Sequence, residues 1–196
     1  MTATLDFYFD YGSPAAYLAW TQVPALARRT GARVNYHPIL LGGVFQATGN
    51  RSPAEVPAKL AWMFRDLQWF AARYGVPFAR NPHFPVNTLG LMRGAVYAQQ
   101  QGFLEPYSDA VFRALWAERR NLGDRKELSR TLGEAGLDGE RILAAMQDPA
   151  IKEALRAATD AAVRRGVFGV PTFFVGNQMH FGQDRLPYVE ELLVPV

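Results

Sequence analysis

Ser13 is the residue whose type and position most directly suggest chemistry. It follows an aromatic, apolar run that is typical of a β-strand, and it precedes Pro14 and a helical pattern. Serine is a preferred N-cap and proline a preferred first helical residue, so a helix is predicted to begin here. The first turn of a helix carries unpaired N–H groups and a partial positive charge, which stabilise an anion such as a thiolate. By itself, the feature is more typical of a serine that only caps a helix.

A second feature is Pro171, which follows Val170 and precedes a strand-like run. A proline at the start of a strand cannot donate a hydrogen bond to the sheet. If the bond between Val170 and Pro171 is cis, the N–H and C=O of Val170 point outward and can pair with an extended peptide. Few X–Pro bonds in folded proteins are cis, so the local sequence alone favours an ordinary strand-entry proline.

The composition excludes several kinds of chemistry. The chain has 196 residues and no cysteine, which rules out disulfides, thiolate metal sites and a cysteine nucleophile. His37, His83 and His180 are far apart and lack the spacing of metal ligands, so no metal is predicted. The net charge of +3 is spread along the chain, which favours solvated helices over a nucleic-acid surface. With no secretory pattern and no membrane-spanning run, we expect a cytoplasmic protein that binds neither nucleic acid nor membranes.

The elements that must position Ser13 form a β-α-β unit. Alternating apolar residues predict a strand over 5–11. A helical pattern follows over about 14–30, and a second short strand is predicted over 34–37. Residues 42–57 are rich in Gly, Asn, Ser and Pro and predict a long loop. Helical patterns without a convincing strand follow, at about residues 58–74, 88–101, 106–119, 125–135 and 139–146.

The C-terminal part returns to a mixed pattern. Its predicted elements are a helix, two strands joined by a Gly-Asn turn and a last helix, at residues 150–165, 172–175, 179–181 and 185–193. We therefore predict an α/β protein: a thioredoxin fold with a large all-helical domain inserted after the N-terminal β-α-β unit. The thioredoxin-like domain is discontinuous, over 1–40 and 149–196, and the inserted helical domain covers 41–148.

Four segments together resemble those of a known family, and the resemblance covers nearly the whole chain. The segments are residues 9–14 (FDYGSP), 41–53 (LGGVFQATGNRSP), 168–172 (FGVPT) and 181–186 (FGQDRL). Each is modest alone, but their order and spacing are fairly specific. The chain resembles the 2-hydroxychromene-2-carboxylate isomerases and the similar kappa-class glutathione transferases, within the DsbA-like branch of the thioredoxin superfamily.

The resemblance implies glutathione as the cofactor. It implies that Ser13 binds the glutathione sulfur, and that Val170, before a cis Pro171, pairs with the cysteinyl backbone. The segment implied to bind the γ-glutamyl end consists of Gln183 and Asp184, and Arg185 is a further residue expected to bind the cofactor. These residue types suit the task, because a hydroxyl donates to a thiolate and a carboxylate accepts from an α-amino group. Serine forms no disulfide, so the site is suited to holding a thiol and not to redox exchange.

For the substrate, the resemblance implies that Asn50 and Lys59 face the active site. A substrate carboxylate needs a cationic or amide partner, and the candidates are Asn50, Arg51, Lys59 and Asn87. For Arg51 and Asn87, an ordinary surface or capping role is at least as good an interpretation. Aromatic side chains that could line a flat pocket, or could simply fill a helical core, are Trp62, Phe64, Trp69, Phe84 and Trp116.

The implied function is a glutathione-dependent isomerisation of 2-hydroxychromene-2-carboxylate to trans-o-hydroxybenzylidenepyruvate, in the catabolism of aromatic hydrocarbons. Glutathione would act as a covalent catalyst, whose thiolate adds to the ring-opened conjugated substrate and is eliminated after bond rotation. Two alternatives stay open: a kappa-class-like glutathione transferase that conjugates electrophiles, and a non-catalytic peptide-binding module. The absence of cysteine excludes a thiol–disulfide oxidoreductase. The family also implies a homodimer.

Overall fold

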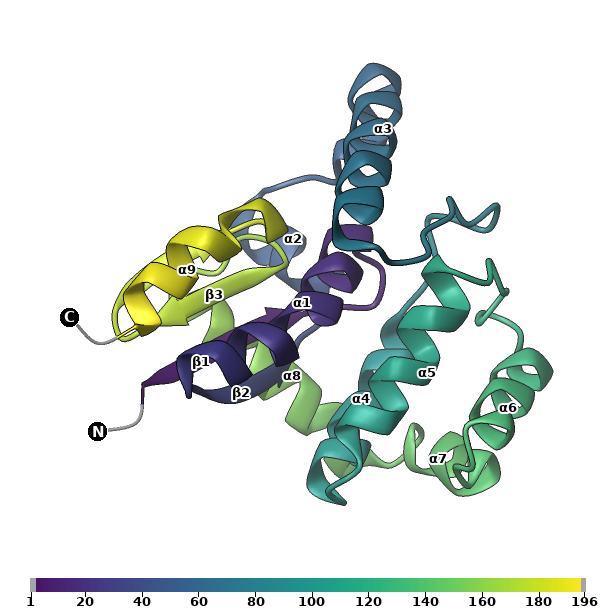
Figure 1. The fold of residues 1–196 in the computed structure, drawn as a ribbon. Helices are drawn as coiled ribbons and strands as arrows, with labels where there is room; N and C mark the ends of the chain where they lie inside the picture. Colours follow the sequence, from purple (N-terminus) through teal and green to yellow (C-terminus); the bar gives the residue numbers. More distant parts are fainter. Residues whose placement is uncertain (1–2, 195–196) are drawn as a thin grey trace.

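The computed structural model describes residues 3–194 and contains the predicted β-α-β unit at the N-terminus (Figure 1). Strand β1, helix α1 and strand β2 cover Thr4–Phe9, Pro14–Thr30 and Arg33–Pro38. The two strands are parallel. Helix α1 begins as predicted, with the Ser13 side chain as its cap, and ends at Gly31, whose φ of 69° is left-handed.

The remaining strands complete a four-stranded mixed sheet. Helix α8, strands β3 and β4, the short 3-10 helix η2 and helix α9 cover Pro149–Arg164, Thr172–Val175, Gln178–Phe181, Gln183–Arg185 and Leu186–Leu193. The order in the sheet is β2-β1-β3-β4, and β3 is antiparallel to both β1 and β4. This is the thioredoxin arrangement, so the predicted fold class is confirmed.

The prediction of a loop over 42–57 is wrong for much of its length. Residues Leu41–Thr48 form helix α2, and a short 3-10 helix, η1, covers Pro53–Glu55. Gly42 and Gly43, near the start of α2, give this segment the composition of a loop, because glycine is a poor helix former when tertiary contacts are left out of account. The helix forms where it packs against α8 and buries Val44, and Gly49 ends it with a left-handed φ of 71°.

Two hydrophobic clusters hold helices on the two faces of the sheet. Because side chains alternate along β1, Phe9 faces α1 and its ring lies 5.4 Å from that of Trp20. Tyr8 points to the other face, in a cluster with Val44 of α2 and Ala162 of α8. Figure 1 shows α1 and α9 on one side of the sheet and α8 on the other.

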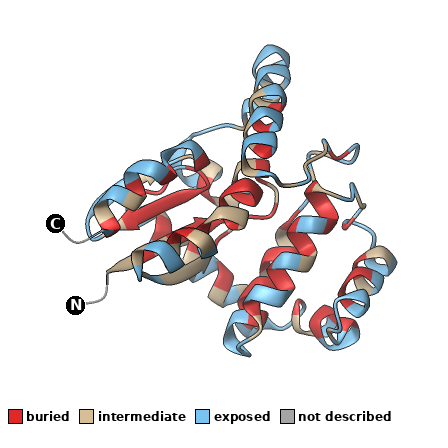
Figure 2. Cartoon of the chain, in the orientation of Figure 1, coloured by how far each residue is buried: buried red, intermediate tan, exposed pale blue. Residues whose placement is uncertain are grey.

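Helices α3 to α7 form the predicted all-helical segment and cover Pro57–Tyr74, Leu89–Gln100, Leu104–Trp116, Arg125–Glu134 and Gly139–Ala145. Their core is continuous with that of the sheet, since the Phe112 ring lies 4.7 Å from the Tyr11 ring and Trp116 Nε1 donates to the Tyr11 carbonyl at 2.8 Å. The division into two domains stays a prediction. Figure 2 shows that α3 is mostly exposed. None of the described helices is long and apolar enough to cross a membrane.

Gly94 in α4 allows the helix packing to be tested. A Cβ at this position would lie 2.7 Å from both Met146 Cε and Tyr107 Cζ, and still closer to the Tyr107 hydroxyl. We expect Gly94→Ala to lower the free energy of unfolding by about 1–3 kcal/mol, because overpacking forces the helices apart. Urea denaturation followed by circular dichroism measures this change.

Gly133→Ala in α6 is the matched control, because a Cβ there would meet no atom within 4 Å. Alanine is the better helix former, so this variant should gain up to about 0.5–1 kcal/mol. A Gly94→Ala protein as stable as the wild type would contradict the close contact between α4 and α5.

Candidate active site

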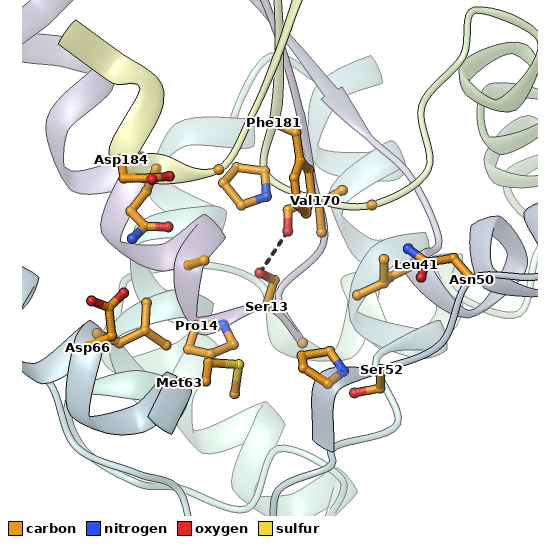
Figure 3. A pocket seen from close by; sticks show the side chains of 18 of the residues that line it. Ser13, Pro14, Leu41, Asn50, Ser52, Met63, Asp66, Val170, Phe181 and Asp184 are labelled. Atoms are coloured by element: carbon orange, nitrogen blue, oxygen red, sulfur yellow. Dashed lines mark hydrogen bonds between the residues drawn. The ribbon is translucent and has the colours of Figure 1, made fainter. Parts of the chain in front are cut away.

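A cavity of about 390 Å³ lies beside the start of α1 (Figure 3). Its lining comes from separate parts of the chain: the turn before α1, helix α2 and the loop after it, the middle of α3, the loop before β3 and the turn after β4. The volume falls in the usual range of about 300–1,000 Å³ for small-molecule sites. The fold thus brings together all four segments that carry the family resemblance.

Ser13 lies in the wall of this cavity and is only 7% exposed. Its Oγ accepts from the Ala16 N–H at 3.1 Å and donates to the Val170 carbonyl at 3.2 Å. Ala15 also lines the cavity, and its N–H has no acceptor among the described residues. The Ala15 N–H is therefore free for an anion, the Ser13 hydroxyl can donate to the same anion by turning away from the Val170 carbonyl, and the helix end adds positive potential.

The loop before β3 faces Ser13 across the cavity. The bond between Val170 and Pro171 is cis, as the resemblance implied. Both residues are buried and line the cavity. Figure 3 shows the Val170 carbonyl directed at the Ser13 hydroxyl. The backbone of Val170 is therefore next to the position where a sulfur held by Ser13 would lie, and its pairing with a cysteinyl backbone stays a prediction.

Asn50 ties this loop to the segment after α2. Its Nδ2 donates to the Phe168 carbonyl at 2.8 Å, and its Oδ1 accepts from the Arg51 N–H at 2.8 Å. Both ends of the amide are thus engaged by backbone groups. Asn50 lines the cavity as predicted for a substrate residue, but the contacts that the structure shows for it position the loop.

Two carboxylates lie on the same side of the cavity (Figure 3). Asp184 comes from η2, where Gln183 and Arg185 also line the cavity, and Asp66 comes from α3. Burial and the negative charge of Asp184 raise the pKa of Asp66. Such a pair favours a cation between its members, for example an α-ammonium group. Asp66 is not among the residues predicted for the site, because a single acidic residue in an amphipathic helix looks like an ordinary surface residue.

Asp10, also missed, lies behind the site and is only 1% exposed. Its carboxylate accepts from the backbone N–H groups of Gly12 and Leu41, each at 2.8 Å. Burial raises its pKa, while these two donors act in the opposite direction. Asp10 therefore joins the turn before α1 to the start of α2. Among residues 3–194, no group of three or more His, Cys, Asp or Glu side chains is arranged to hold a metal ion.

The fold places only one of the other three predicted substrate residues in the lining of the cavity. Arg51 lines the cavity, whereas Lys59 and Asn87 do not. Lys59 lies on the exposed part of α3. Asn87 lines an adjoining cavity of about 400 Å³, which shares Phe45 and Phe84 with the first one.

The aromatic side chains are divided in the same way. Trp62 and Phe84 line the cavity, while Phe64 and Trp116 are buried in the main core. Trp69 is 57% exposed on α3. Both interpretations of these residues, a pocket wall and a helical core, therefore hold for some of them.

The mixed sheet, the capped serine and the cis-proline loop opposite it define a DsbA-like thioredoxin-fold protein. A family profile described as a DSBA-like thioredoxin domain matches residues 4–194. An isomerase of Sphingobium xenophagum that acts on 2-hydroxychromene-2-carboxylate is 37% identical over 196 residues, which cover 99% of this chain and 100% of the relative. The chain belongs to the 2-hydroxychromene-2-carboxylate isomerase family of DSBA-like proteins.

More distant relatives and solved structures agree with this assignment. Human glutathione S-transferase kappa 1 is 26% identical over 97% of this chain and 90% of its own length. A crystallised 2-hydroxychromene-2-carboxylate isomerase has a TM-score of 0.87 and 32% identity, with 96% of this chain and 93% of that chain covered. A probable DsbA oxidoreductase from Streptomyces coelicolor, at 23% identity and a TM-score of 0.74, shares the fold.

Gly182, just before η2, provides a test of the carboxylate pair. Its φ is 106°, and a Cβ would lie 2.5 Å from Asp184 Oδ1. We expect Gly182→Ala to weaken the binding of a ligand ammonium group between Asp66 and Asp184 about tenfold, because Asp184 must move, and to lower stability by about 1–3 kcal/mol through backbone strain. Isothermal titration calorimetry measures the affinity.

Gly176→Ala, in the turn between β3 and β4, separates the two effects. Its φ of 58° is also left-handed, but a Cβ there would meet nothing within 4 Å. This variant should lose stability and keep the affinity for such a ligand. Equal affinity losses in both variants would show that strain in the hairpin, and not the displacement of Asp184, is responsible.

Proposed function

We propose that this protein is a glutathione-dependent isomerase that converts 2-hydroxychromene-2-carboxylate to trans-o-hydroxybenzylidenepyruvate. The observation that carries the proposal is the Ser13 hydroxyl at the N-terminus of α1, opposite the Val170 carbonyl, in a chain without cysteine. Full-length relatives named as this isomerase support the reaction. Relatives named as kappa glutathione S-transferases support the cofactor.

The environment of Ser13 would keep the glutathione sulfur ionised. A free thiol of the cysteine type has a pKa of about 8.5, so it is mostly protonated at neutral pH. One hydrogen bond to a charged group contributes about 1.5–3 kcal/mol, which corresponds to roughly 1–2 pKa units. Together with the helix end, the Ser13 hydroxyl would make the thiolate the main form near neutral pH.

The ends of the cavity fit the rest of glutathione. Val170 offers backbone groups beside the sulfur position, as a cysteinyl residue requires. Asp66 and Asp184 would hold the α-ammonium group of the γ-glutamyl end, since each carboxylate can accept a charge-assisted hydrogen bond. Arg185, next to Asp184, would pair with the α-carboxylate, and the backbone of Gln183 completes this end.

Glutathione would supply a thiolate that adds to a conjugated carbon and leaves again, so that a double bond can rotate. The residues of this chain would ionise the sulfur, hold the planar substrate and pair with its carboxylate. A flat ring bound in the adjoining cavity would lie against Phe45 and Phe84, which line both cavities. Arg51 is the cation of the lining on this side, and Asn50 fixes the loop beneath it.

A kappa-class-like transferase is the second candidate, because it would use the same contacts to glutathione. The higher identity to the isomerase, 37% against 26% for the human transferase, favours isomerisation. Parallel assays with 2-hydroxychromene-2-carboxylate and a chlorodinitrobenzene-type electrophile separate the two activities.

A peptide-binding module, the third candidate, would not be stabilised by glutathione. The proposal also includes a cytoplasmic homodimer that acts in aromatic hydrocarbon catabolism.

Ser13→Ala tests the proposed role of the hydroxyl. Without its hydrogen bond, the pKa of the enzyme-bound thiol should rise by about 1–2 units, and turnover near neutral pH should fall about 10- to 100-fold. The ultraviolet absorbance of the thiolate, followed against pH, reports the first change. An assay of the isomerisation reports the second.

Ser52→Ala is the matched control for this experiment. Ser52 also lines the cavity and also caps a helix, with its Oγ accepting from the Ala54 N–H at 3.2 Å. Its loss should leave the thiol pKa unchanged. If Ser13→Ala left both ionisation and turnover unaltered, the functional assignment would have to be given up even though the fold is right.

Asp66→Asn tests the proposed grip on the γ-glutamyl end. We expect glutathione affinity to fall about tenfold, because a charged acceptor for the ammonium group is lost. The raised pKa of Asp66 also means that the wild type takes up a proton at this site as the pH falls, before an ordinary aspartate would. Wild-type affinity should therefore weaken on acidification, and this part of the pH dependence should be absent in the variant.

Glu191→Gln on α9 is the charge-matched control, since Glu191 is exposed and lies outside the cavity lining. Calorimetric titrations of both variants across the acid range provide the comparison. Identical pH profiles for the wild type and Asp66→Asn would exclude Asp66 from the binding of glutathione.

A further inference from the structure

A groove of about 750 Å³ lies between α2, α4 and α8, outside the cavity that holds Ser13. Each helix contributes residues about one turn apart, so each presents one face to the groove. Leu89 and Arg93 come from α4, and Lys152 comes from the first turns of α8. Leu40, just before α2, lines both this groove and the cavity adjoining the candidate active site.

Arg93 is the feature of the groove that ordinary surface chemistry does not explain. Its Nε is shielded from solvent and has no hydrogen-bond acceptor among residues 3–194. Buried donors without an acceptor are unfavourable and rare in folded proteins. No group of the described chain therefore neutralises this guanidinium, and its terminal nitrogens, which are not shielded in the same way, are the donors that Arg93 offers to the groove.

The carboxylates of the groove are already paired elsewhere. Glu153 and Asp160 both contact Arg156, at 2.6 and 2.8 Å. Within the part of the chain that the structure describes, Arg93 and Lys152 have no carboxylate partner. The lining thus has three cations against two carboxylates, and neither carboxylate contacts Arg93 or Lys152.

We propose that this groove is a second ligand site, which binds a small amphipathic carboxylate with its anionic group between Arg93 and Lys152. A guanidinium can donate two parallel N–H bonds to a carboxylate, and the two terminal nitrogens of Arg93 would be the donors. The apolar walls include Leu89 and Leu155, which suit an aromatic or branched aliphatic body. An inorganic anion would leave these walls uncovered.

Helix α2 separates this site from the candidate active site. Ala47 lines the groove, while Leu41 and Phe45 line the cavities on the other side. The start of α2 is also tied to α8, because Thr159 Oγ1 accepts from the Leu40 N–H at 3.0 Å. A ligand in the groove would therefore contact the same helix as a ligand in the active site, and binding has to be measured with glutathione present.

Benzoate is a suitable probe, and benzamide is its neutral isostere. Each is titrated into glutathione-saturated protein and followed by ¹H–¹⁵N NMR shifts. We expect saturable benzoate binding with shifts in α2, α4 and α8, and at least tenfold weaker binding of benzamide. Arg93→Gln should weaken benzoate binding at least tenfold, and Arg93→Lys, which keeps the charge but not the paired donors, should lie between the two.

Arg164→Gln is the control, because it removes the same charge from α8 outside the groove. It should leave benzoate affinity unchanged. If Arg93→Gln unfolds the protein, Lys152→Gln reports on the same site. The proposal is overturned if benzoate does not saturate, if its affinity survives the substitutions of Arg93 and Lys152, or if the shifts cluster around Ser13 only.

Discussion

The two hydrogen bonds of the Ser13 hydroxyl are the interaction on which the rest of the site depends. The oxygen accepts from Ala16 in the first turn of α1 and donates to Val170 in the loop before β3, so one side chain joins helix and loop. An incoming anion can leave the helix cap intact, because only the O–H has to turn away from the Val170 carbonyl. That carbonyl then becomes free to accept from an N–H of the same ligand.

The geometry around this hydroxyl is supported from both parts of the fold. Behind it, the buried carboxylate of Asp10 holds the turn before α1 and the start of α2. From the helical segment, Trp116 donates to the Tyr11 carbonyl, and the Tyr11 hydroxyl is 2.7 Å from Ser108 Oγ. The helices inserted between α2 and α8 therefore position the turn that carries Ser13, in addition to supplying Asp66 to the cavity wall.

Features with a strong local signal could be predicted from the sequence. Ser13 and Pro14 mark the start of α1 because capping depends on the residues at the cap itself, and the alternation of strand residues shows in the same way. Helix α2 could not be predicted, since its stability comes from packing on α8 and its two glycines argue against a helix. Asp10 and Asp66 acquire their roles only through partners far away in the sequence, which no local pattern reports.

The presence of a serine, and not a cysteine, at the start of α1 also determines how the site responds to oxidants. The chain has no cysteine, and the Ser13 hydroxyl cannot be converted to a sulfenic acid or a mixed disulfide. Met63 provides the single protein sulfur in the described cavity lining. With glutathione bound as proposed, peroxide would damage the exchangeable tripeptide and one thioether of the protein, and fresh tripeptide from solution would restore the reactive thiol.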